Sequence, residues 1–255
     1  MAYDFNRLGP ARGAKVLVCG GCGGIGRAIV RGCLDTGLDT TVFDLQRTHD
    51  QSPVPAGVRF IAFDAYDESS VRAAFATLAK THPALDAIIN LVGAGNSPGP
   101  LTTKDVKHFD EDISRNLRSA FLISKHGIPL LQHSGAGSLV HTASGVAVRP
   151  LKNVGAYAAA KGGLISLSKT LAIENAPKVR VNVVAPGGVT NKVKVSTAGA
   201  VGPGGLDVSE VTRMIPMARV SDPEDLVGPF LFLAGPMSAQ MTGQVLHVNG
   251  GAVMP

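Results

Sequence analysis

The chain has 255 residues, of which 45% are hydrophobic and 5% aromatic, and its formal net charge is +5. A chain of this length can bury a substantial core. Its lysines and arginines are scattered singly among acids, without a basic run or interleaved aromatic residues, so we expect no nucleic-acid partner. No uninterrupted apolar stretch is long enough to cross a bilayer, and the first residues contain no apolar signal segment. We therefore expect a cytoplasmic protein that does not bind membranes.

The three cysteines, Cys19, Cys22 and Cys33, cannot all pair with one another, which argues against a disulfide scaffold. Cys19 and Cys22 form a Cys-x-x-Cys motif, but the chain has no second such pair and no histidine nearby to complete a zinc site. We expect no metal site, and we interpret these cysteines as small side chains that fill a tight loop.

Short apolar runs alternate with longer helical patterns along the chain. In chain order we predict a strand at 15–19, a helix at 24–36, strands at 40–43 and 58–62, a helix at 67–80, a strand at 85–92, a long helix at 110–133, a strand at 138–142, a helix at 155–175, a strand at 179–184, a helix at 222–234 and a strand at 244–248. Strands that are apolar on both faces and separated by helices indicate an α/β fold. The expected architecture is one Rossmann-type, doubly wound domain over residues 1–255, with a seven-stranded parallel sheet flanked by helices.

One irregular stretch begins at Gly187 and is rich in glycine and other small residues. Long loops inside compact domains are usually disordered or functional. This one follows the sixth predicted strand, at the carboxyl ends of the strands, where α/β proteins bind ligands. We interpret residues 187–215 as a substrate loop.

The first predicted strand leads directly into a glycine-rich turn, Gly20 to Gly26, which opens the first helix. Glycines in such a turn let backbone N–H groups approach a pyrophosphate at the helix N-terminus. Asp44 ends the second strand, close to the expected offset of about twenty residues. Its carboxylate can accept the hydroxyls of an adenosine ribose and would repel a 2′-phosphate, so NAD is favoured over NADP. Alternatively, Asp44 caps a turn and Arg47 meets a phosphate.

Tyr157 and Lys161 are four residues apart, which places them on one face of the helix predicted at 155–175. An unperturbed tyrosine titrates near pH 10, so a tyrosine base at neutral pH needs a neighbouring positive charge. Lys161 can supply that charge. Ser144 follows the fifth strand, and its hydroxyl can hydrogen-bond a substrate oxygen at the same edge of the sheet. The alternative is an ordinary exposed tyrosine–lysine pair.

With these motifs, the sequence resembles the short-chain dehydrogenase/reductase family, in its classical group, from about Gly13 to the C-terminus. The resemblance implies the catalytic residues Asn116, Ser144, Tyr157 and Lys161. It also implies cofactor-binding positions, which are Gly20, Gly24, Ile25, Gly26, Asp44, Asp64, Asn90, Gly93, Tyr157, Lys161, Pro186, Gly187, Val189 and Thr190. One segment departs from the family, because its usual Asn-Asn-Ala-Gly is here Asn90-Leu91-Val92-Gly93.

The resemblance implies that Tyr157 exchanges a proton with the substrate oxygen while a hydride moves to or from the nicotinamide. Ser144 would hold that oxygen, Lys161 would lower the tyrosine pKa, and Asn116 would hold a water that relays protons to solvent. Small apolar residues expected around the pocket favour a small, mainly apolar secondary alcohol or ketone. The alternatives are an NADPH-dependent 3-oxoacyl-carrier-protein reductase and a cofactor-binding sensor without turnover.

We also expect a homotetramer, or a dimer, because the helix predicted at 155–175 has more apolar positions than one sheet face needs. These positions are Ala158, Ala159, Leu164, Leu167 and Leu171. The resemblance implies that this helix and the one predicted at 110–133 form the subunit interfaces.

Overall fold

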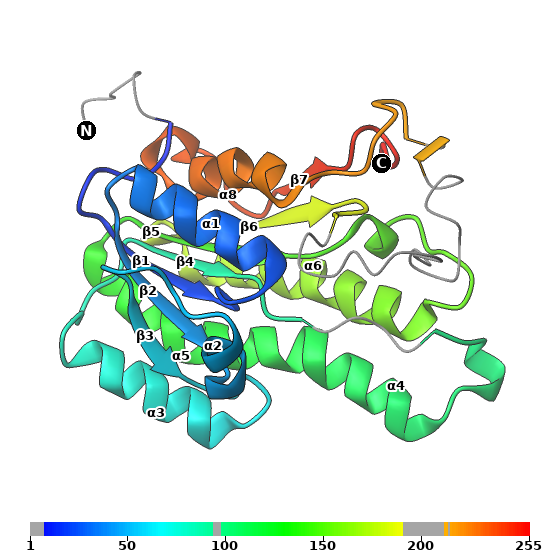
Figure 1. Cartoon of the computed structure of the whole chain (residues 1–255), viewed down its shortest axis with the longest axis horizontal. Coiled ribbons are helices and arrows are strands. Elements are labelled where there is room, and N and C mark those ends of the chain that lie inside the picture. The colour runs from blue at the N-terminus through cyan, green and yellow to red at the C-terminus, as the bar shows by residue number, and fades with distance from the viewer. Residues whose placement is uncertain (1–7, 94–97, 191–211, 214) are drawn as a thin grey trace.

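The computed structural model describes residues 8–93, 98–190, 212–213 and 215–255. Figure 1 shows a central sheet with helices on both sides. All neighbouring strands are parallel, in the order β3-β2-β1-β4-β5-β6-β7. The strands are β1 Lys15–Cys19, β2 Asp39–Asp44, β3 Arg59–Ala62, β4 Ala87–Asn90, β5 Gly137–Thr142, β6 Val179–Pro186 and β7 Val245–Val248. The predicted seven-stranded parallel sheet is confirmed.

Alternate side chains of the buried strands face opposite helical layers, as the pleat of a strand requires. Leu17 of β1 belongs to a core cluster with residues of α3 (Glu68–Ala79) and α5 (Ser119–Ser134). Its neighbours Val16 and Val18 belong to a second cluster, with α1 (Gly24–Asp35) and α8 (Val227–Ala234). α6 (Gly155–Asn175) runs beside β6 and contributes Ala172 to the first cluster. The two clusters hold the sheet between the helical layers.

The strand order reverses between β1 and β4. From β1 the chain moves outward through β2 to β3, then returns to place β4 on the other side of β1. Cys19, at the end of β1, therefore pairs with Phe43 on one side and with Asn90 on the other. Ligands of open α/β sheets bind in the crevice at such a reversal, outside the carboxyl ends of the strands. The glycine-rich turn, Asp44 and the segment after Asn90 all meet at this point.

Two helical segments differ from the sequence prediction. The short α2 (Gln46–Gln51) was not predicted, because it buries no residue and so shows no apolar period. The long helix expected from Asp110 begins earlier, with α4 (Val106–Ile113), whose polar first turn hid its start. Asp105 caps it by accepting a hydrogen bond from the Lys107 N–H at 2.7 Å. A π-helical turn, Ser114–Arg118, joins α4 to α5.

Most of the predicted substrate loop, residues 191–211 and 214, lies outside the described residues. Its beginning is described as far as Thr190, and Val189 forms a parallel bridge with Ser221. Among the helices described, none is both long and apolar enough to span a membrane.

Candidate active site

The glycine-rich turn brings the backbone close to itself and to neighbouring strands. Gly20 has φ +84°, a left-handed conformation that favours glycine, and its N–H donates to the Phe43 carbonyl at 2.8 Å. A Cβ on Gly26 would collide with the Gly20 carbonyl oxygen, and a Cβ on Gly21 would lie 2.7 Å from a methyl group of Val42. α1 begins at Gly24 without a side-chain cap. The first-turn N–H groups of α1 are thus arranged to receive an anion.

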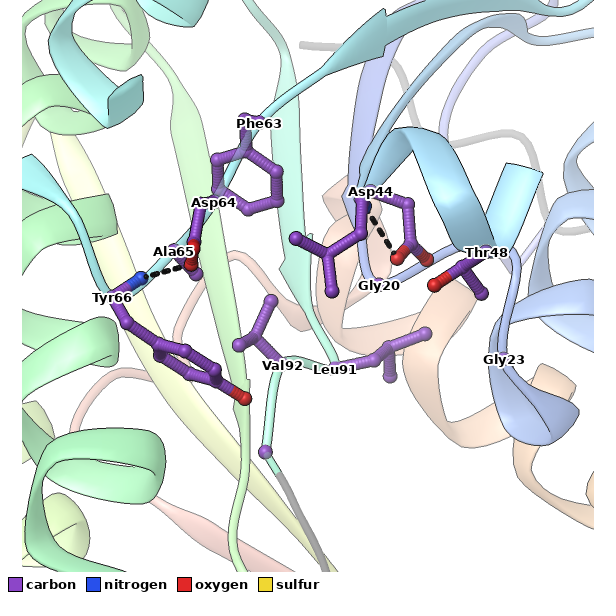
Figure 2. A pocket seen from close by; sticks show the side chains of 12 residues that line it. Gly20, Gly23, Asp44, Thr48, Phe63, Asp64, Ala65, Tyr66, Leu91 and Val92 are labelled. Carbon is purple, nitrogen blue, oxygen red and sulfur yellow. Dashed lines mark hydrogen bonds between the residues drawn. The ribbon is translucent and has the colours of Figure 1, made fainter. Parts of the chain in front are cut away.

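Asp44 forms the wall of a cavity of about 220 Å³ beside this turn. Its Oδ2 accepts a hydrogen bond from the Cys22 N–H at 2.9 Å, and its Oδ1 accepts one from the Leu45 N–H at 2.8 Å. Figure 2 shows Asp44 and Thr48 on one side of this cavity and Asp64 and Tyr66 on the other. The carboxylate is therefore fixed by the glycine turn while it lines the cavity.

The opposite wall of the cavity is built around Asp64. Its carboxylate accepts a hydrogen bond from the Tyr66 N–H at 2.9 Å, and its own N–H donates to Ser70 Oγ at 2.8 Å. Leu91, Val92 and Gly93 line the cavity as well, and Figure 2 shows Leu91 and Val92 between the two walls. This lining offers apolar contact area bordered by two carboxylates, which suits an adenosine.

Asn90 shapes this cavity by fixing the backbone that follows it. Its side chain is buried, where Oδ1 accepts a hydrogen bond from the Val92 N–H at 3.0 Å and Nδ2 lies 3.0 Å from His141 Nδ1. Burial lowers the pKa of His141 to about 3, so the ring is neutral and Nδ1 can accept from Asn90. Asn90 thus fixes the path of Leu91 to Gly93, although the side chain next to it is no longer the usual asparagine.

Tyr157 and Lys161 lie in the first two turns of α6, as their spacing predicted. Lys161 Nζ is buried, donates to the Thr142 carbonyl at 2.8 Å and lies 5.7 Å from the centre of the Tyr157 ring. Burial lowers the pKa of Lys161 to about 8. Burial also raises the pKa of Tyr157, and a hydrogen bond to Ser144 partly offsets this rise. In the protein alone, burial thus outweighs the Ser144 hydrogen bond in its effect on the Tyr157 pKa.

Ser144 follows β5 and caps the short 3₁₀ turn Gly145–Ala147, where its Oγ accepts from the Val146 N–H at 3.4 Å. The same Ser144 hydroxyl also forms a hydrogen bond with Tyr157, so the O–H groups of the two residues lie side by side. Two such groups can hold a single substrate oxygen.

Asn116 lies in the π-helical turn, completely buried. Its Nδ2 donates to the Asp112 carbonyl at 2.9 Å, whereas its buried Oδ1 has no hydrogen-bond partner among the described residues. A Cβ built on Gly93 would lie 2.8 Å from this Oδ1 and 3.2 Å from Lys161 Nζ. The two polar atoms therefore converge on Gly93, and an acceptor left free there by the described residues suits the water expected from the resemblance.

The segment after β6 is held by contacts with the end of β7 and with Asp222. Pro186 ends the strand, the Gly187 N–H donates to the Val248 carbonyl at 3.1 Å, and a Cβ on Gly187 would lie 2.9 Å from Asn249 Cβ. The Thr190 hydroxyl donates to Asp222 Oδ1 at 2.7 Å. This network fixes the segment expected to meet the nicotinamide. Ile25, also expected to meet the cofactor, is partly buried and packs against the core cluster that includes α1.

The sequence prediction missed several residues at this site. Thr48 and Tyr66 line the cavity but belong to no motif. Lys104 and Asp112 form a buried ion pair of 3.1 Å near Asn116. A signal for Asp112 exists, since it precedes Asn116 by four residues and so shares its helix face.

Comparison with known proteins supports the same assignment. The family model described as "Enoyl-(Acyl carrier protein) reductase" matches residues 20–253. The chain is 31% identical over 247 residues to a 3-oxoacyl-(acyl-carrier-protein) reductase FabG from Chlamydia pneumoniae, covering 94% of this chain and 96% of that protein. It is 30% identical to an uncharacterized short-chain type dehydrogenase/reductase from Sinorhizobium fredii, covering 97% of this chain but only 45% of that protein. The chain belongs to the short-chain dehydrogenase/reductase family.

A solved structure agrees with this family. The aldohexose dehydrogenase of Thermoplasma acidophilum in its ligand-free form superposes with a TM-score of 0.83 at 27% identity, covering 94% of each chain. This short-chain dehydrogenase/reductase is accordingly an oxidoreductase that uses a nicotinamide cofactor, NAD or NADP, and acts on CH–OH or C=O groups.

Proposed function

We propose that this enzyme is NAD-dependent and transfers a hydride between NAD and a small, mainly apolar secondary alcohol or ketone. The observation that supports NAD most directly is the Asp44 carboxylate, which two backbone N–H groups hold at the cavity beside the glycine turn. A fixed negative charge there accepts ribose hydroxyls and repels a 2′-phosphate. The small walls that support an apolar substrate are Gly145, Val146, Ala147, Gly187 and Gly188.

The cofactor fits residues that the chain provides. The glycine turn and the N-terminus of α1 would hold the pyrophosphate, Asp44 the adenosine ribose, and the walls around Asp64 the adenine. The segment from Pro186 to Thr190 would hold the carboxamide of the nicotinamide. The bound nicotinamide supplies the hydride acceptor or donor.

The protein's own groups move the proton. In oxidation of an alcohol, Tyr157 takes the hydroxyl proton, and Ser144 donates a hydrogen bond to the same oxygen as its charge develops. Lys161 lies beside the tyrosine ring and holds a positive charge that favours tyrosinate. Asn116 Oδ1 would hold the water through which the proton leaves toward solvent. In reduction of a ketone, Tyr157 gives the proton back along the same path.

The cofactor proposal is tested by titrating the purified protein with NAD and NADP in parallel. Asp44→Ala should weaken NAD binding by about tenfold or more, because hydrogen bonds to a charged group are lost, and should remove the preference for NAD. Asp44→Asn keeps an oxygen for the Cys22 N–H, so it separates loss of the charge from loosening of the glycine turn. Asp50→Ala, at an exposed acid in α2, is the matched control. NADP binding as tight as NAD in the unaltered enzyme would contradict the proposal.

The substrate proposal is then tested with a panel of secondary alcohols and the preferred cofactor. The second candidate function is an NADPH-dependent 3-oxoacyl-carrier-protein reductase, and the similarity to FabG along nearly its whole length favours it. A preference for NADPH, together with turnover of acyl-carrier-protein substrates and none of simple alcohols, would establish this alternative.

Finally, we propose that the enzyme assembles as a homotetramer or a dimer. Large apolar side chains exposed on α4, α5 and α6 support an interface over these helices. They are Val106, Phe109, Phe121 and Ile173.

A further inference from the structure

A buried ion pair joins the segment that precedes α4 to α4 itself. Lys104 follows the 3₁₀ turn η1 (Leu101–Thr103), and its Nζ lies 3.1 Å from Asp112 Oδ2. The side chains are only 7% and 1% exposed. Burying two charges costs solvation energy that their attraction often fails to recover, so such a pair is weak evidence for stability alone. Stability alone therefore does not explain why the pair is found at this place.

Asp112 lies one helical turn before Asn116. Its backbone carbonyl accepts the Asn116 Nδ2 hydrogen bond at 2.9 Å. Asp112 belongs to α4 and Asn116 to the π-helical turn that follows, and both elements pack against α6 (Figure 1). Neither carboxylate oxygen of Asp112 accepts a hydrogen bond within the described part of the chain. Its negative charge is therefore balanced chiefly by the Lys104 ammonium, 3.1 Å from Oδ2.

α4 and the π-helical turn both pack against α6, which carries Tyr157, so the Asp112 charge lies within electrostatic reach of the phenol. Three described elements present charged or hydrogen-bonding groups to that side chain. Ser144, after β5, donates or accepts a hydrogen bond and lowers the tyrosine pKa, whereas Asp112, on α4, raises it. Lys161, on α6 itself, lies 5.7 Å from the ring centre. Lys104 contacts Asp112 on α4 and so determines how much negative charge Tyr157 experiences.

We propose that the buried Lys104–Asp112 pair is a charge-balancing element of the active site, in which Lys104 neutralises Asp112 and so allows Tyr157 to release its proton. Both are positioning residues, because they act through Tyr157 and not on the substrate. This inference rests on the proposed function in one respect only, the role of Tyr157 as the acid/base. The titration of Tyr157 itself can be measured without any substrate.

The two residues should shift this titration in opposite directions. Lys104→Met leaves Asp112 uncompensated beside the phenol, so tyrosinate forms about one pH unit higher. Asp112→Asn removes the negative charge at nearly constant shape, so tyrosinate forms at lower pH. The double variant Lys104→Met/Asp112→Asn removes both charges and should titrate close to the unaltered enzyme or slightly below it.

The experiment is an ultraviolet absorbance titration of tyrosinate, which is favourable because the chain has three tyrosines and no tryptophan. Subtracting the titration of each variant carrying Tyr157→Phe isolates the signal of Tyr157. Lys107→Met, at an exposed lysine in the first turn of α4, is the control that should change nothing. The pH dependence of alcohol oxidation should move with the titration, to higher pH in Lys104→Met and to lower pH in Asp112→Asn.

Opposite shifts, with recovery in the double variant, support the inference. Unchanged Tyr157 titration in both single variants, or shifts in the same direction, overturns it, and lowered melting temperatures alone would assign the pair a structural role. If one single variant does not fold, the other decides: tyrosinate must form at higher pH in Lys104→Met or at lower pH in Asp112→Asn, and no shift overturns the inference. If no protein oxidises any alcohol, the proposed function fails while the absorbance titration still tests the pair.

Discussion

At the scale of single residues, the site is dominated by what burial does to charge. Lys161 is enclosed, donates to the Thr142 carbonyl and has a pKa lowered to about 8 from its ordinary value of 10.5. The lowering arises from lost hydration, which disfavours the charged form. At neutral pH most of the lysine is nevertheless charged, so the protein holds a cation against the tyrosine at a cost in folding free energy. That cost is the physical signature of a residue kept for function.

Lys161→Met should therefore stabilise the fold at neutral pH while it removes activity. Between pH 8 and pH 10.5 the unfolded chain binds the lysine proton and the folded chain does not, so the stability of the unaltered enzyme rises with pH over this window. At pH 7 the buried charge costs about 3 kcal/mol, from which the lost hydrogen bond subtracts about 1–2 kcal/mol. The variant should thus be more stable by about 1–2 kcal/mol at pH 7.

Urea denaturation at pH 7 and pH 10 measures this difference. The advantage of Lys161→Met should shrink or reverse at the higher pH, and turnover should fall about a hundredfold or more at every pH. A stability difference that does not change with pH would show that the lysine is not held charged in a water-poor site.

At the scale of elements, the site depends on backbones that approach closely. The π-helical turn Ser114–Arg118 places Asn116 against the segment that follows β4, where Gly93 leaves space beside Asn116 Oδ1 and Lys161 Nζ. π-helical turns within helices occur frequently at functional sites, because they reposition side chains that a regular helix would carry past. Here the turn brings an amide oxygen that has no partner among the described residues to the same glycine as Lys161 Nζ.

Gly93→Ala should disrupt this arrangement without unfolding the protein. The new Cβ would lie 2.8 Å from Asn116 Oδ1 and 3.2 Å from Lys161 Nζ, so one of these groups must move. We expect turnover to fall about tenfold to a hundredfold, because small displacements of catalytic groups carry costs of that size. Steady-state kinetics and circular dichroism measure the two effects.

Gly228→Ala is the matched control, at a helical glycine whose Cβ would meet nothing within 4 Å. It should leave turnover unchanged, because the new methyl group meets no atom of another segment. Equal losses of activity in the two variants would mean that the space at Gly93 has no special role.

At the scale of the whole molecule, the expected subunit interface includes exposed apolar residues that the sequence did not single out. Of the apolar positions named from the sequence, Ala158 and Leu164 are buried within the chain and Leu171 packs against its core, whereas Ala159 is exposed and Leu167 half-buried. The exposed apolar side chains lie elsewhere on the same helices, among them Phe121 at 47% and Ile173 at 81% exposure. Exposed apolar patches of this kind commonly mark contacts between proteins.

Gel filtration of the purified enzyme should therefore give a mass well above the 26.2 kDa of one chain. Phe121→Glu and Ile173→Asp, made singly, should lower that mass, because a charge placed in an apolar contact is costly to bury. Lys169→Glu, at an exposed lysine of α6, controls for a simple change of charge on this helix. A monomeric unaltered enzyme would refute the assembly.

The sequence by itself determined the parallel α/β sheet and the site motifs, because both depend on the spacing of residues that are close together in the chain. Apolar strands separated by helices require a covered parallel sheet, and Tyr157 and Lys161 share a helix face whatever surrounds them. Helix α6 was predicted with its observed bounds. The start of α4 and the short α2 were missed, since neither shows an apolar period in its first turn.

Only the tertiary structure decided how buried each group is and which distant segments meet. It brought Gly93 to Asn116 and Lys161, engaged the side chain of Asn90 with His141, and placed Lys104 against Asp112. It also buried Tyr157, which raises the pKa of its phenol. These outcomes depend on desolvation and on contacts between residues far apart in the chain, and neither quantity is contained in the spacing of residues along it.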